Sequence, residues 1–406
     1  MLTHLAGPYV VGIDAGGTKT RCVVLTLGGA LAGSGTGPGA NPNSGGDTAG
    51  ALTTALREAL GDLDRTRILT GVFGIAGAGS AGRPAAVAAA RQAWQAVGLR
   101  GSPAVVTDIA VAFAAGTSEP KGIVVFSGTG AGAAVISDGS IVQRADGYGW
   151  LVGDEGSAVW LGKEAVRAAL AAYDGRGSPT LLTDSVPRAL LGPTVVAEID
   201  SARRRPRARR ELAMAGAVPA PPGAASALPQ TVPLASAFPS PAGGGTSTAV
   251  LIPGSPVPRP DVNGPGPPGR SGDPDGPHHP EMSGTPPNPQ LAQAIIKEVY
   301  GRPPAALGRL GPVVAAAAAA GDPVARRITE EAAEWLLRDV DAVRPALSDP
   351  CAPVVMHGSV LREGPVAEAV RTGLRDRFAE APRSAGDGAV GAAGLALRRL
   401  GHPLPG

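Results

Sequence analysis

The chain contains one local pattern twice, and this repetition constrains its fold more than any other feature. In the first copy, the apolar segment 9–14 is followed by a turn of sequence AGGTKT and by a second apolar segment at 21–25. In the second copy, apolar residues at 122–126 precede a turn of sequence SGTGAG and the apolar segment 133–136. Each copy predicts strand, glycine turn and strand. We therefore predict two similar halves, each with a turn that can hold phosphate.

Apolar periodicity elsewhere fits the α/β class. Short apolar segments bounded by Gly, Ser or Asp predict further strands at 68–75, 104–108, 140–142 and 354–356. Apolar residues at helical spacing predict helices at 48–60, 83–97, 109–115, 157–173, 291–300, 307–320, 323–347, 365–378 and 389–400. Asp47 is the candidate N-cap of the helix at 48–60. Strands that alternate with helices in this way are typical of α/β domains.

The segment 201–289 differs from the rest of the chain in composition. Of its 89 residues, 21 are Pro, 12 are Gly and one is aromatic. Such a segment cannot bury enough apolar surface to offset the entropy of ordering it, so we predict a disordered insertion. Its six arginines between 203 and 210 could dock nucleic acid or membrane, although a solvated linker is the interpretation we favour. The globular sequence then divides into a first domain at 8–118 and a second domain formed by 119–200 and 290–400.

Charge and cysteine content exclude several classes of protein. The formal net charge is +2 at pH 7, and outside 201–289 the chain has 28 Lys or Arg against 29 Asp or Glu, so no basic field marks a nucleic-acid partner. Two cysteines, Cys22 and Cys351, are too few for a disulfide framework or a cysteine-rich metal site. No apolar run is long enough to cross a bilayer, and no basic segment precedes an apolar stretch near the N-terminus. We therefore expect a cytoplasmic protein with neither a membrane nor a nucleic-acid partner.

The first turn carries the residue types that a nucleotide phosphate site needs. Gly16 and Gly17 lack a Cβ, so their backbone N–H groups can approach phosphate oxygens, and the neighbouring Thr18 and Lys19 belong to the same candidate site. Asp14 precedes the turn, where a carboxylate suits a Mg²⁺ ion that keeps most of its waters. The pattern is not a Walker motif, because GxxxxGK[ST] does not occur in the chain. For this motif taken alone, an ordinary hairpin turn is the alternative.

The second turn, with Thr129 and Gly130, repeats these features, and two such turns can hold a triphosphate from opposite sides. Asp108 ends the strand predicted at 104–108 and lies between the two turns in sequence. A carboxylate at the carboxyl end of a strand is well placed to act as the base for a substrate hydroxyl. The alternative role for Asp108 is the N-cap of the helix that follows.

The segment 147–157 is the most specific of the candidate sites. It contains four glycines, two aromatic residues and the adjacent acids Asp154 and Glu155. A packed core does not need this combination, whereas a sugar site uses aromatic rings against apolar ring faces and carboxylates as acceptors for hydroxyls. The alternative is a glycine-rich Ω-loop with Trp150 in the core and Ser157 capping the next helix.

A glycine and a serine, Gly358 and Ser359, follow the strand predicted at 354–356. A turn of this kind at a strand end lets a nucleoside approach the backbone closely. Taken alone, the two residues would be a plain turn. The presence of two phosphate turns favours the nucleoside contact.

Taken in order, these motifs resemble those of the actin-like ATPase superfamily. The motifs are GIDAGGTKT at 12–20, TD at 107–108, SGTG at 127–130, WLVGDEGS at 150–157 and GS at 358–359. The GDEGS element makes the chain similar to the BadF/BadG/BcrA/BcrD-type ATPase family and, within it, to N-acetylglucosamine kinases. The resemblance covers nearly all of 8–200 and 291–400. It implies two actin-like, ribonuclease H-like domains with a cleft between them.

The resemblance also implies a role for each candidate residue. The site for ATP and Mg²⁺ would consist of Asp14, Gly16, Gly17, Thr18, Lys19, Thr129, Gly130 and Gly358, with Asp14 holding the metal through water. The amino-sugar site would consist of Asn41, Asp108, Gly147, Tyr148, Gly149 and Asp154, with Asp108 as the catalytic base. The implied reaction is in-line transfer of the γ-phosphate of ATP to the 6-hydroxyl of N-acetylglucosamine.

Two other activities remain open at this point. A glucosamine kinase would use the same fold and the same aspartate with a different pocket around the 2-substituent. An ATP-driven activator of an acyl-CoA dehydratase or reductase needs cysteine thiolates for an iron–sulfur cluster, and neither Cys22 nor Cys351 lies in a predicted cluster loop. The motifs do not determine which sugar is used, or whether the chain forms a homodimer.

Overall fold

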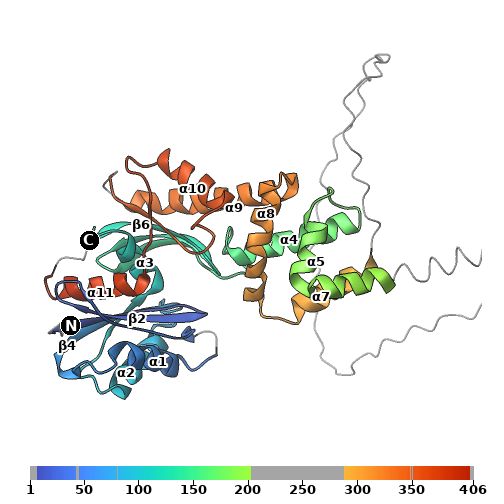
Figure 1. Ribbon diagram of the computed structural model, residues 1–406. Helices are drawn as coiled ribbons and strands as arrows, with labels where there is room; N and C mark the ends of the chain where they lie inside the picture. The colour runs from blue at the N-terminus through green and yellow to red at the C-terminus, as the bar shows by residue number, and fades with distance from the viewer. Residues whose placement is uncertain are drawn as a thin grey trace, which may run out of the picture. The chain divides into compact units, whose positions relative to one another are not determined.

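The structure, a computed structural model, describes residues 7–42, 45–79, 81–202, 288–347, 349 and 351–402 (Figure 1). The insertion predicted at 201–289 lies almost wholly outside the described residues, so its disorder stays a prediction. At its edges, Ser201 and Ala202 are helical and Asn288 caps the helix that begins at Pro289. In the described part of the chain, no helix is both long enough and apolar enough to span a bilayer.

The first half of the chain forms a five-stranded mixed sheet. Its strands are β1 (Tyr9–Ala15), β2 (Lys19–Thr26), β3 (Leu31–Pro38), β4 (Ile68–Ile75) and β5 (Ala104–Thr107). Their order is β3-β2-β1-β4-β5, in which β1 to β3 form an antiparallel meander and β4 and β5 continue parallel to β1. Because parallel strands end at the same edge of a sheet, the residues that close β1 and β5 lie at one edge.

The second sheet repeats this topology. Its strands are β6 (Lys121–Ser127), β7 (Ala131–Ser137), β8 (Ser140–Asp146), β9 (Val354–His357) and β10 (Arg383–Ser384). The order is β10-β9-β6-β7-β8, again an antiparallel meander of three strands with two parallel strands added to its first member. The repeated pattern in the sequence is therefore a repeated topology, as predicted.

The sequence analysis did not identify β3, because its glycines and its lack of apolar alternation do not resemble a strand. Gly33, Gly35 and Gly37 all face α1 (Thr48–Leu60). A Cβ placed on them would lie 2.1, 2.3 and 2.5 Å, respectively, from a carbonyl oxygen of this helix. Real Cβ contacts are never this short, so only glycine at these alternate positions lets α1 pack directly onto the strand.

One face of the first sheet is covered by α1 and α2 (Arg83–Ala96). Asp47 caps α1, as the sequence predicts, and its carboxylate accepts the backbone N–H of Gly50 at 2.8 Å. The core on this face includes Trp94 and Phe73, whose rings meet edge to face with centroids 5.8 Å apart. This side of the sheet is therefore a conventional apolar core.

Two helices, α3 (Asp108–Gly116) and α11 (Gly388–Arg399), lie between the two sheets and share one apolar core with both (Figure 1). A Cβ on Gly12 of β1 would lie 2.1 Å from the carbonyl oxygen of Ala389, so α11 rests directly on β1. The small residues of α11 thus bring the start of this helix to the edge where β1 ends.

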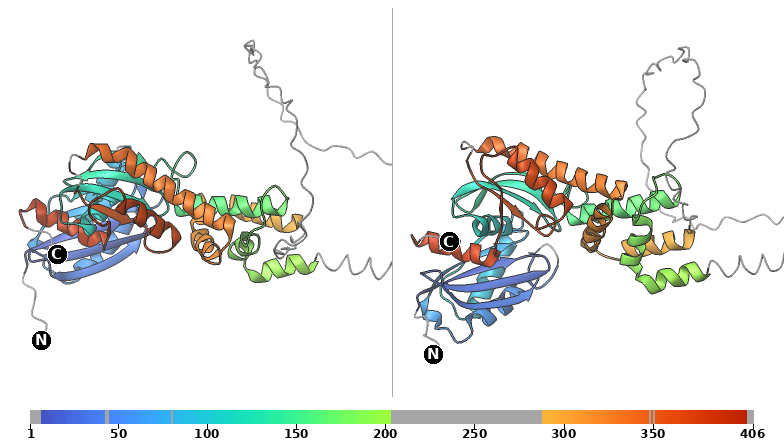
Figure 2. Two further views of the ribbon diagram at one scale, coloured as in Figure 1. Left: turned by 90° about the horizontal axis from the view of Figure 1, so that it is seen from above. Right: turned by 45° about the horizontal axis from the view of Figure 1, so that its top comes forward.

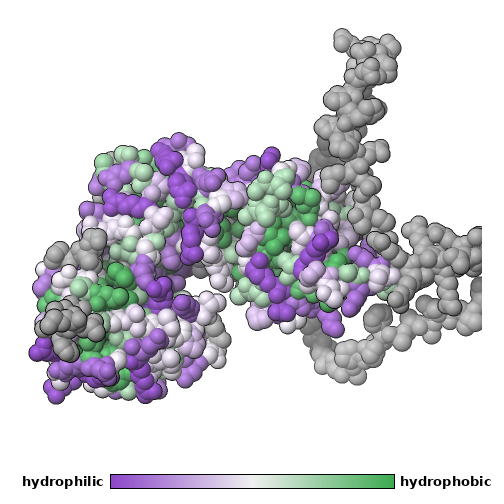
Figure 3. Space-filling view, viewed as in Figure 1, coloured by the Kyte–Doolittle hydropathy of each residue, from purple (hydrophilic) through white to green (hydrophobic). Residues whose placement is uncertain are grey.

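The other face of the second sheet is covered by α9 (Pro323–Val343), and α10 (Pro365–Arg375) packs on α9. The remaining helices of this half pack on one another and on α9; they are α4 (Ala158–Tyr173), α5 (Leu182–Leu191), α7 (Pro289–Tyr300) and α8 (Gly311–Ala319), with a 3₁₀ helix, η3 (Pro304–Leu310), before α8. The long helix α9 packs across β6, β7 and β8 (Figure 2). The surface over α8, which consists mostly of Ala and Val, is largely apolar (Figure 3).

The largest differences from the predicted helices concern 307–320 and 323–347. The single helix predicted at 307–320 is divided into η3 and α8, and Pro312 lies at the second position of α8, where a proline favours a new helix start. The helix predicted at 323–347 ends at Val343 and continues only as a short 3₁₀ turn that contains Pro345, which cannot donate a helical hydrogen bond.

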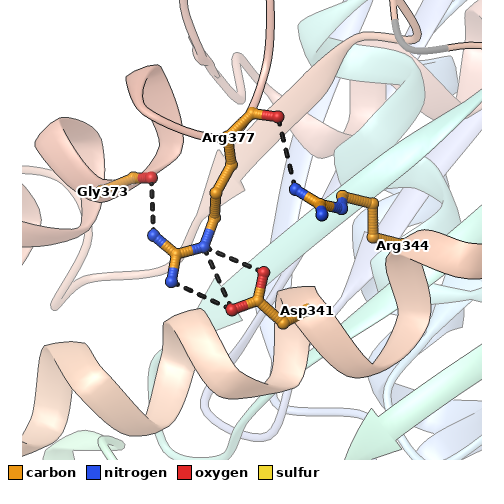
Figure 4. A network of polar contacts seen from close by, with 4 residues as sticks. All are labelled: Asp341, Arg344, Gly373 and Arg377. Carbon is orange, nitrogen blue, oxygen red and sulfur yellow. Dashed lines mark hydrogen bonds and ion pairs between the residues drawn. The ribbon is translucent and has the colours of Figure 1, made fainter.

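An arginine after α10 fastens this helix to α9 (Figure 4). Arg377 donates from Nε to Oδ1 of Asp341 at 2.9 Å and from Nη2 to Oδ2 at 2.9 Å, and it also donates to the carbonyl oxygen of Gly373 at 2.9 Å. Arg344 donates in turn to the carbonyl oxygen of Arg377 at 3.5 Å. This two-point arginine–carboxylate contact fixes the angle between the two helices.

Candidate active site

The turn between β1 and β2 leaves backbone groups open to a ligand. The N–H of Gly16 donates to the carbonyl oxygen of Lys19 at 3.0 Å, which closes the hairpin. A Cβ on Gly17 would meet no atom within 4 Å, and Gly17, Thr18 and Lys19 are all exposed. The geometry therefore leaves room for a phosphate group against this turn.

The segment after β3 supports the same turn. The N–H of Ala40 donates to the carbonyl oxygen of Gly16 at 3.0 Å, and a Cβ on Gly39 would lie 2.2 Å from the carbonyl oxygen of Gly17. Asn41, the candidate sugar ligand, is the next residue and is partly buried. The structure thus places Asn41 beside the first turn.

Asp108 follows β5 and is the first residue of α3. The helix is capped by Thr107, whose hydroxyl accepts the backbone N–H of Ala110 at 3.3 Å. The alternative reading of Asp108 as the N-cap is therefore wrong. Its carboxylate lies at the carboxyl edge of the first sheet, where the parallel strand β1 ends in Asp14 and Ala15.

At this edge of the sheet, the negative charge of Asp108 affects the pKa of Asp14. The pKa of Asp14 is raised from its ordinary 3.8 to about 7, chiefly by burial and then by the negative charges of Asp108 and Asp387, while Arg21 opposes the rise. Burial also raises the pKa of Asp108, against the effect of a hydrogen bond from the N–H of Ile109. Asp108 is therefore close enough to raise the pKa of Asp14, and both carboxylates are poorly solvated.

Asp387 is a third carboxylate that the sequence analysis missed. It caps α11 by accepting the N–H of Ala389 at 3.0 Å, and it forms an ion pair with Arg21 at 2.7 Å. A Cβ on Gly388 would lie 2.3 Å from Oδ2 of Asp14, so the start of α11 lies directly against that carboxylate. The only sequence signal was an Asp-Gly pair ahead of a helix, which is common at helix starts.

A magnesium ion fits these carboxylates. In the part of the chain that the structure describes, no group of three His, Cys, Asp or Glu side chains could hold a metal ion by itself. Mg²⁺ binds through oxygen, keeps several waters and commonly uses one or two carboxylates together with substrate phosphates. Asp14 lies next to the open turn, and its carboxylate could hold such an ion through water; burial and then the negative charges of Asp108 and Asp387 raise its pKa, a rise that a bound cation would oppose.

The second turn, between β6 and β7, is held at its base. The N–H of Gly128 donates to the carbonyl oxygen of Gly130 at 2.8 Å, and the N–H of Ala158, at the start of α4, donates to the carbonyl oxygen of Gly128 at 2.8 Å. The buried hydroxyl of Ser127 donates to Gly156 at 2.8 Å. Thr129, at the tip, is exposed and available to a ligand.

Gly358 lies against this second turn. A Cβ on Gly358 would lie 2.1 Å from the carbonyl oxygen of Ser127, and the φ of Gly358 is +103°, a conformation that favours glycine. The N–H of Val360 donates to the same carbonyl oxygen at 3.1 Å. The predicted nucleoside and phosphate contacts of the second domain are therefore neighbours.

Asp154 also reaches the second turn. Its Oδ1 accepts the N–H of Ala131 at 3.3 Å, and a Cβ on Gly130 would lie 3.2 Å from its carboxylate oxygens. Asp154 is buried, at 8% exposed, and burial raises its pKa, an effect opposed first by the N–H of Ala131. The most specific motif of the sequence thus places an acid beside the second glycine turn.

The aromatic residues of the loop 147–156 point to solvent. Tyr148 is 67% exposed and Trp150 is 44% exposed, so the alternative with Trp150 in the core is wrong. Gly147 and Gly149 have φ values of +76° and +101°, which make the loop turn sharply. Ser157 caps α4 by accepting the N–H of Trp160 at 3.1 Å, as that alternative did predict.

A cavity of about 360 Å³ opens beside Gly358 and Ser359. It is lined by Ala158, Leu161, Gly308, Arg309, Gly311, Pro312, Ala315, Thr329, Ser359, Val360, Glu363, Gly364, Pro365 and Val366. The volume lies in the range of small-molecule sites, and apolar side chains with a few polar groups are their usual lining. The residues from η3, α8 and α9 have no recognisable motif in the sequence, because they meet only in the folded chain.

The candidate residues therefore form two groups. The first, at the edge of the first sheet, contains Asp14, Gly16, Gly17, Thr18, Lys19, Asn41 and Asp108. The second, at the edge of the second sheet, contains Thr129, Gly130, Asp154 and Gly358, with Gly147, Tyr148 and Gly149 in the adjoining loop. Each group joins residues that are far apart in sequence.

A doubled sheet with this strand order, and a glycine turn between the first two strands of each copy, defines a two-domain actin-like fold. The chain belongs to the BadF/BadG/BcrA/BcrD ATPase family, whose model matches residues 11–396.

Individual relatives agree with this family. The chain is 32% identical over 180 residues to an N-acetylmuramic acid/N-acetylglucosamine kinase of Clostridium acetobutylicum, and the match covers 44% of this chain and 58% of that protein's length. A solved structure of a protein assigned as an N-acetylglucosamine kinase of Chromobacterium violaceum is 21% identical, with a TM-score of 0.54 over 95% of this chain and 98% of that one. A similarly assigned protein of Porphyromonas gingivalis is 16% identical, with a TM-score of 0.57 over 96% and 99%. At these identities the two structures establish the fold.

Proposed function

We propose that the chain is an ATP-dependent kinase that phosphorylates the 6-hydroxyl of N-acetylglucosamine. The observation that carries the proposal is the pair of carboxylates Asp14 and Asp108, brought together at one edge of the first sheet beside an open glycine turn. Phosphoryl transfer needs this combination: a place for the phosphates, a negative group for a divalent cation and a base for the acceptor hydroxyl.

The two turns would hold the triphosphate. Backbone N–H groups of Gly16, Gly17 and Thr18, with the charge of Lys19, would contact phosphate oxygens from one side, and Thr129 and Gly130 from the other. The cavity beside Gly358 would take the nucleoside. Magnesium, held through water by Asp14, would neutralise charge that develops on the phosphates.

Asp108 would orient the sugar hydroxyl and accept its proton. Burial raises its pKa, which increases its affinity for a proton and makes it a stronger base than a solvated aspartate. Its place at the start of α3, where Thr107 provides the cap, leaves the carboxylate available for the substrate. Positioning of the hydroxyl in line with the γ-phosphate would supply much of the acceleration.

Asn41 and the loop 147–154 would bind the sugar. Asp154 would accept sugar hydroxyls, and Gly147 and Gly149 would present backbone groups next to the ring of Tyr148. The names of the relatives, which include N-acetylglucosamine and N-acetylmuramic acid kinases, support an N-acetylated amino sugar. Closure of the two groups around the sugar would exclude water and limit hydrolysis of ATP.

Glucosamine is the second candidate substrate, and one observation favours it. The loop contains two adjacent acids, Asp154 and Glu155, and burial raises the pKa values of both, while Arg144 and Lys163 oppose the rise. A cationic 2-amino group would be attracted to such a site. An acetamido group would instead use the backbone and hydroxyl donors and acceptors of the same loop.

The activator of acyl-CoA enzymes is not supported as an alternative. Cys22 is buried in β2, where burial raises the pKa of its thiol, and Cys351 is an exposed residue ahead of β9. An iron–sulfur cluster needs several accessible thiolates, and Cys351 is the single exposed cysteine of the two. A cytoplasmic location and a homodimer remain proposals from the sequence.

The test is a comparison of kcat/KM for N-acetylglucosamine, N-acetylmuramic acid, glucosamine and glucose with the full-length chain and saturating Mg·ATP. We expect N-acetylglucosamine to be the best of the four, with glucose roughly tenfold or more lower because the groups that pair the amide are left unpaired. Nuclear magnetic resonance of the product should show phosphate at the 6-position. A higher kcat/KM for glucosamine than for N-acetylglucosamine would make glucosamine the assigned substrate. No turnover with any sugar would overturn the proposal.

A further inference from the structure

Asp146, the last residue of β8, joins the two ends of the candidate sugar loop. Its Oδ1 accepts the backbone N–H groups of Tyr148 at 3.3 Å and Asp154 at 2.9 Å, and its Oδ2 accepts the N–H of Glu155 at 3.0 Å. The side chain is buried, and the φ of Asp146 is +58°, which is uncommon for a residue other than glycine. One carboxylate therefore organises a loop of nine residues.

The packing around Asp146 leaves little freedom for other arrangements. A Cβ on Gly153 would lie 2.2 Å from Oδ1 of Asp146, so the loop closes directly onto the carboxylate. Asp154, the next residue, has a φ of +57° and contacts the second phosphate turn through Ala131. The position of the Asp154 carboxylate thus depends on the hydrogen bond between its own N–H and Asp146.

We propose that Asp146 is a positioning residue that holds the loop 147–155 in the form that binds sugar, and that Asp339 on α9 completes this arrangement as a neutral carboxylic acid. The proposal rests on the proposed function, because it assigns to this loop the binding of the sugar. It goes beyond that function in naming two residues that do not touch the sugar.

Asp339 carries the second part of the argument. Its Oδ2 is buried and has no hydrogen-bond partner among the described residues. An unpaired carboxylate oxygen in such a place is costly, whereas a protonated one is a donor. The acids Asp146 and Glu155 are close enough for their negative charges to act on Asp339, but no hydrogen bond joins either of them to its Oδ2.

The charges around Asp339 agree with a neutral form. Burial, followed by the negative charges of Asp146 and Glu155, raises its pKa to about 7. Burial also raises the pKa of Glu155, and Asp146 adds to this rise, while Lys163 of α4 opposes it. The remaining charged groups of this region are Asp154 in the loop and Arg144 on β8, which interact with each other.

The sign of the pH effect follows from these groups. Below about pH 7, Asp339 is neutral and adds no negative charge to this region. As the pH rises through this value, Asp339 gains a negative charge near the carboxyl groups of Asp146 and Glu155, which weakens the ordered loop. Sugar affinity should therefore fall at alkaline pH.

Asp339→Asn is the decisive variant, because asparagine keeps the shape of the neutral acid and cannot become charged. Calorimetry between pH 5.5 and 8.5 would give the Kd for N-acetylglucosamine. We expect the affinity of the wild-type chain to fall several-fold, roughly three- to tenfold, over this range, and that of Asp339→Asn to stay flat. Glu330→Gln, an exposed site on the same helix, is the control and should behave as the wild type. Equal pH dependence in Asp339→Asn and the wild type would overturn the role of Asp339.

Asp146→Asn tests the positioning role. Its amide replaces one acceptor oxygen, so we expect the KM for sugar to rise about tenfold or more while the KM for ATP stays within about twofold. Because the charge of Asp146 raises the pKa of Asp339, its loss should also shift the pH dependence of sugar binding to lower pH, a change that a purely structural role would not produce. An equal rise in the KM for sugar and the KM for ATP would overturn the positioning role of Asp146.

Hydrogen exchange of the sugar-free chain separates this inference from the proposed function. After correction for intrinsic exchange rates, the amides of 147–155 should lose protection at pH 8.5 in the wild type and keep it in Asp339→Asn. If this exchange pattern is found but no variant binds any sugar, the roles of Asp146 and Asp339 in ordering the loop would stand. The proposed sugar kinase function would then be overturned. Protection that does not depend on either Asp146 or Asp339 would overturn the inference itself.

Discussion

The backbone N–H of Ala131 donates a hydrogen bond to Oδ1 of Asp154 at 3.3 Å. Ala131 begins β7 directly after the turn that contains Thr129 and Gly130, so the acid of the candidate sugar loop is fastened to the candidate phosphate turn. The two sites are therefore one structural unit in the second domain. A change in either is expected to alter the other.

Asp108→Asn should lower kcat by ~10²–10⁴-fold and leave the Kd for Mg·ATP nearly unchanged, because the base is lost while both turns remain. The measurement is steady-state kinetics with N-acetylglucosamine, together with nucleotide binding by calorimetry. Asp62→Asn, an exposed aspartate after α1, is the matched control and should be as active as the wild type. Turnover of Asp108→Asn within a few-fold of the wild type would place the base elsewhere.

Asp14 should make the metal-free protein less stable as the pH rises. Its carboxyl has a pKa of 3.8 when unfolded and about 7 when folded, so the stability present at low pH is lost progressively between these values. Asp14→Asn removes this titration. We expect its free energy of unfolding at pH 8 to exceed that of the wild type by roughly 2 kcal/mol, with little difference at pH 4.

Denaturant unfolding at several pH values, without metal or nucleotide, measures this effect. Added Mg·ATP should stabilise the wild type more than Asp14→Asn at pH 8, because the carboxylate is then used by the ligand. Identical pH dependence of the two proteins would mean that Asp14 is not perturbed by its neighbours.

The same added methyl group should lower stability at one glycine and leave it unchanged at another. In Gly35→Ala the methyl meets the carbonyl oxygen of Ala55 at 2.3 Å, so the free energy of unfolding should fall by about 2–3 kcal/mol or more. In Gly17→Ala the methyl meets nothing within 4 Å, so stability should stay within about 0.5 kcal/mol.

The affinity for ATP should also distinguish Gly17→Ala from Gly35→Ala. Gly17→Ala places its methyl where phosphate is expected, and the Kd for ATP should rise about tenfold, a loss near 1.4 kcal/mol. Gly35→Ala that remains folded at low temperature should bind ATP normally. Unchanged ATP affinity in Gly17→Ala would remove the first turn from the nucleotide site.

Filling the cavity beside Gly358 should block the nucleoside. Ala315 lines this cavity, whereas the next residue, Ala316, is exposed on the helix surface. Ala315→Trp is expected to raise the KM for ATP about tenfold or more without changing the Kd for sugar, and Ala316→Trp is the control. An unchanged KM for ATP in Ala315→Trp would show that the nucleoside binds in another place.

Local sequence patterns were sufficient for most of the elements, because strands and helices depend on the spacing of apolar residues. The strand at 68–75 and the helix at 48–60 with its cap at Asp47 were predicted with the bounds that the structure has. The strand β3 was missed because its glycines are explained only by the approach of α1. A strand whose sequence serves a close helix contact carries no periodic signal of its own.

The sequence by itself determined the repeated strand–turn–strand pattern, the two glycine turns and the types of residue at the candidate site. Only the tertiary structure brought Asp14, Asp108 and Asp387 to one edge and placed Asp339 beside Asp146. The physical reason is that a pKa depends on burial and on charges through space. The groups that perturb these acids come from strands and helices far apart in the chain.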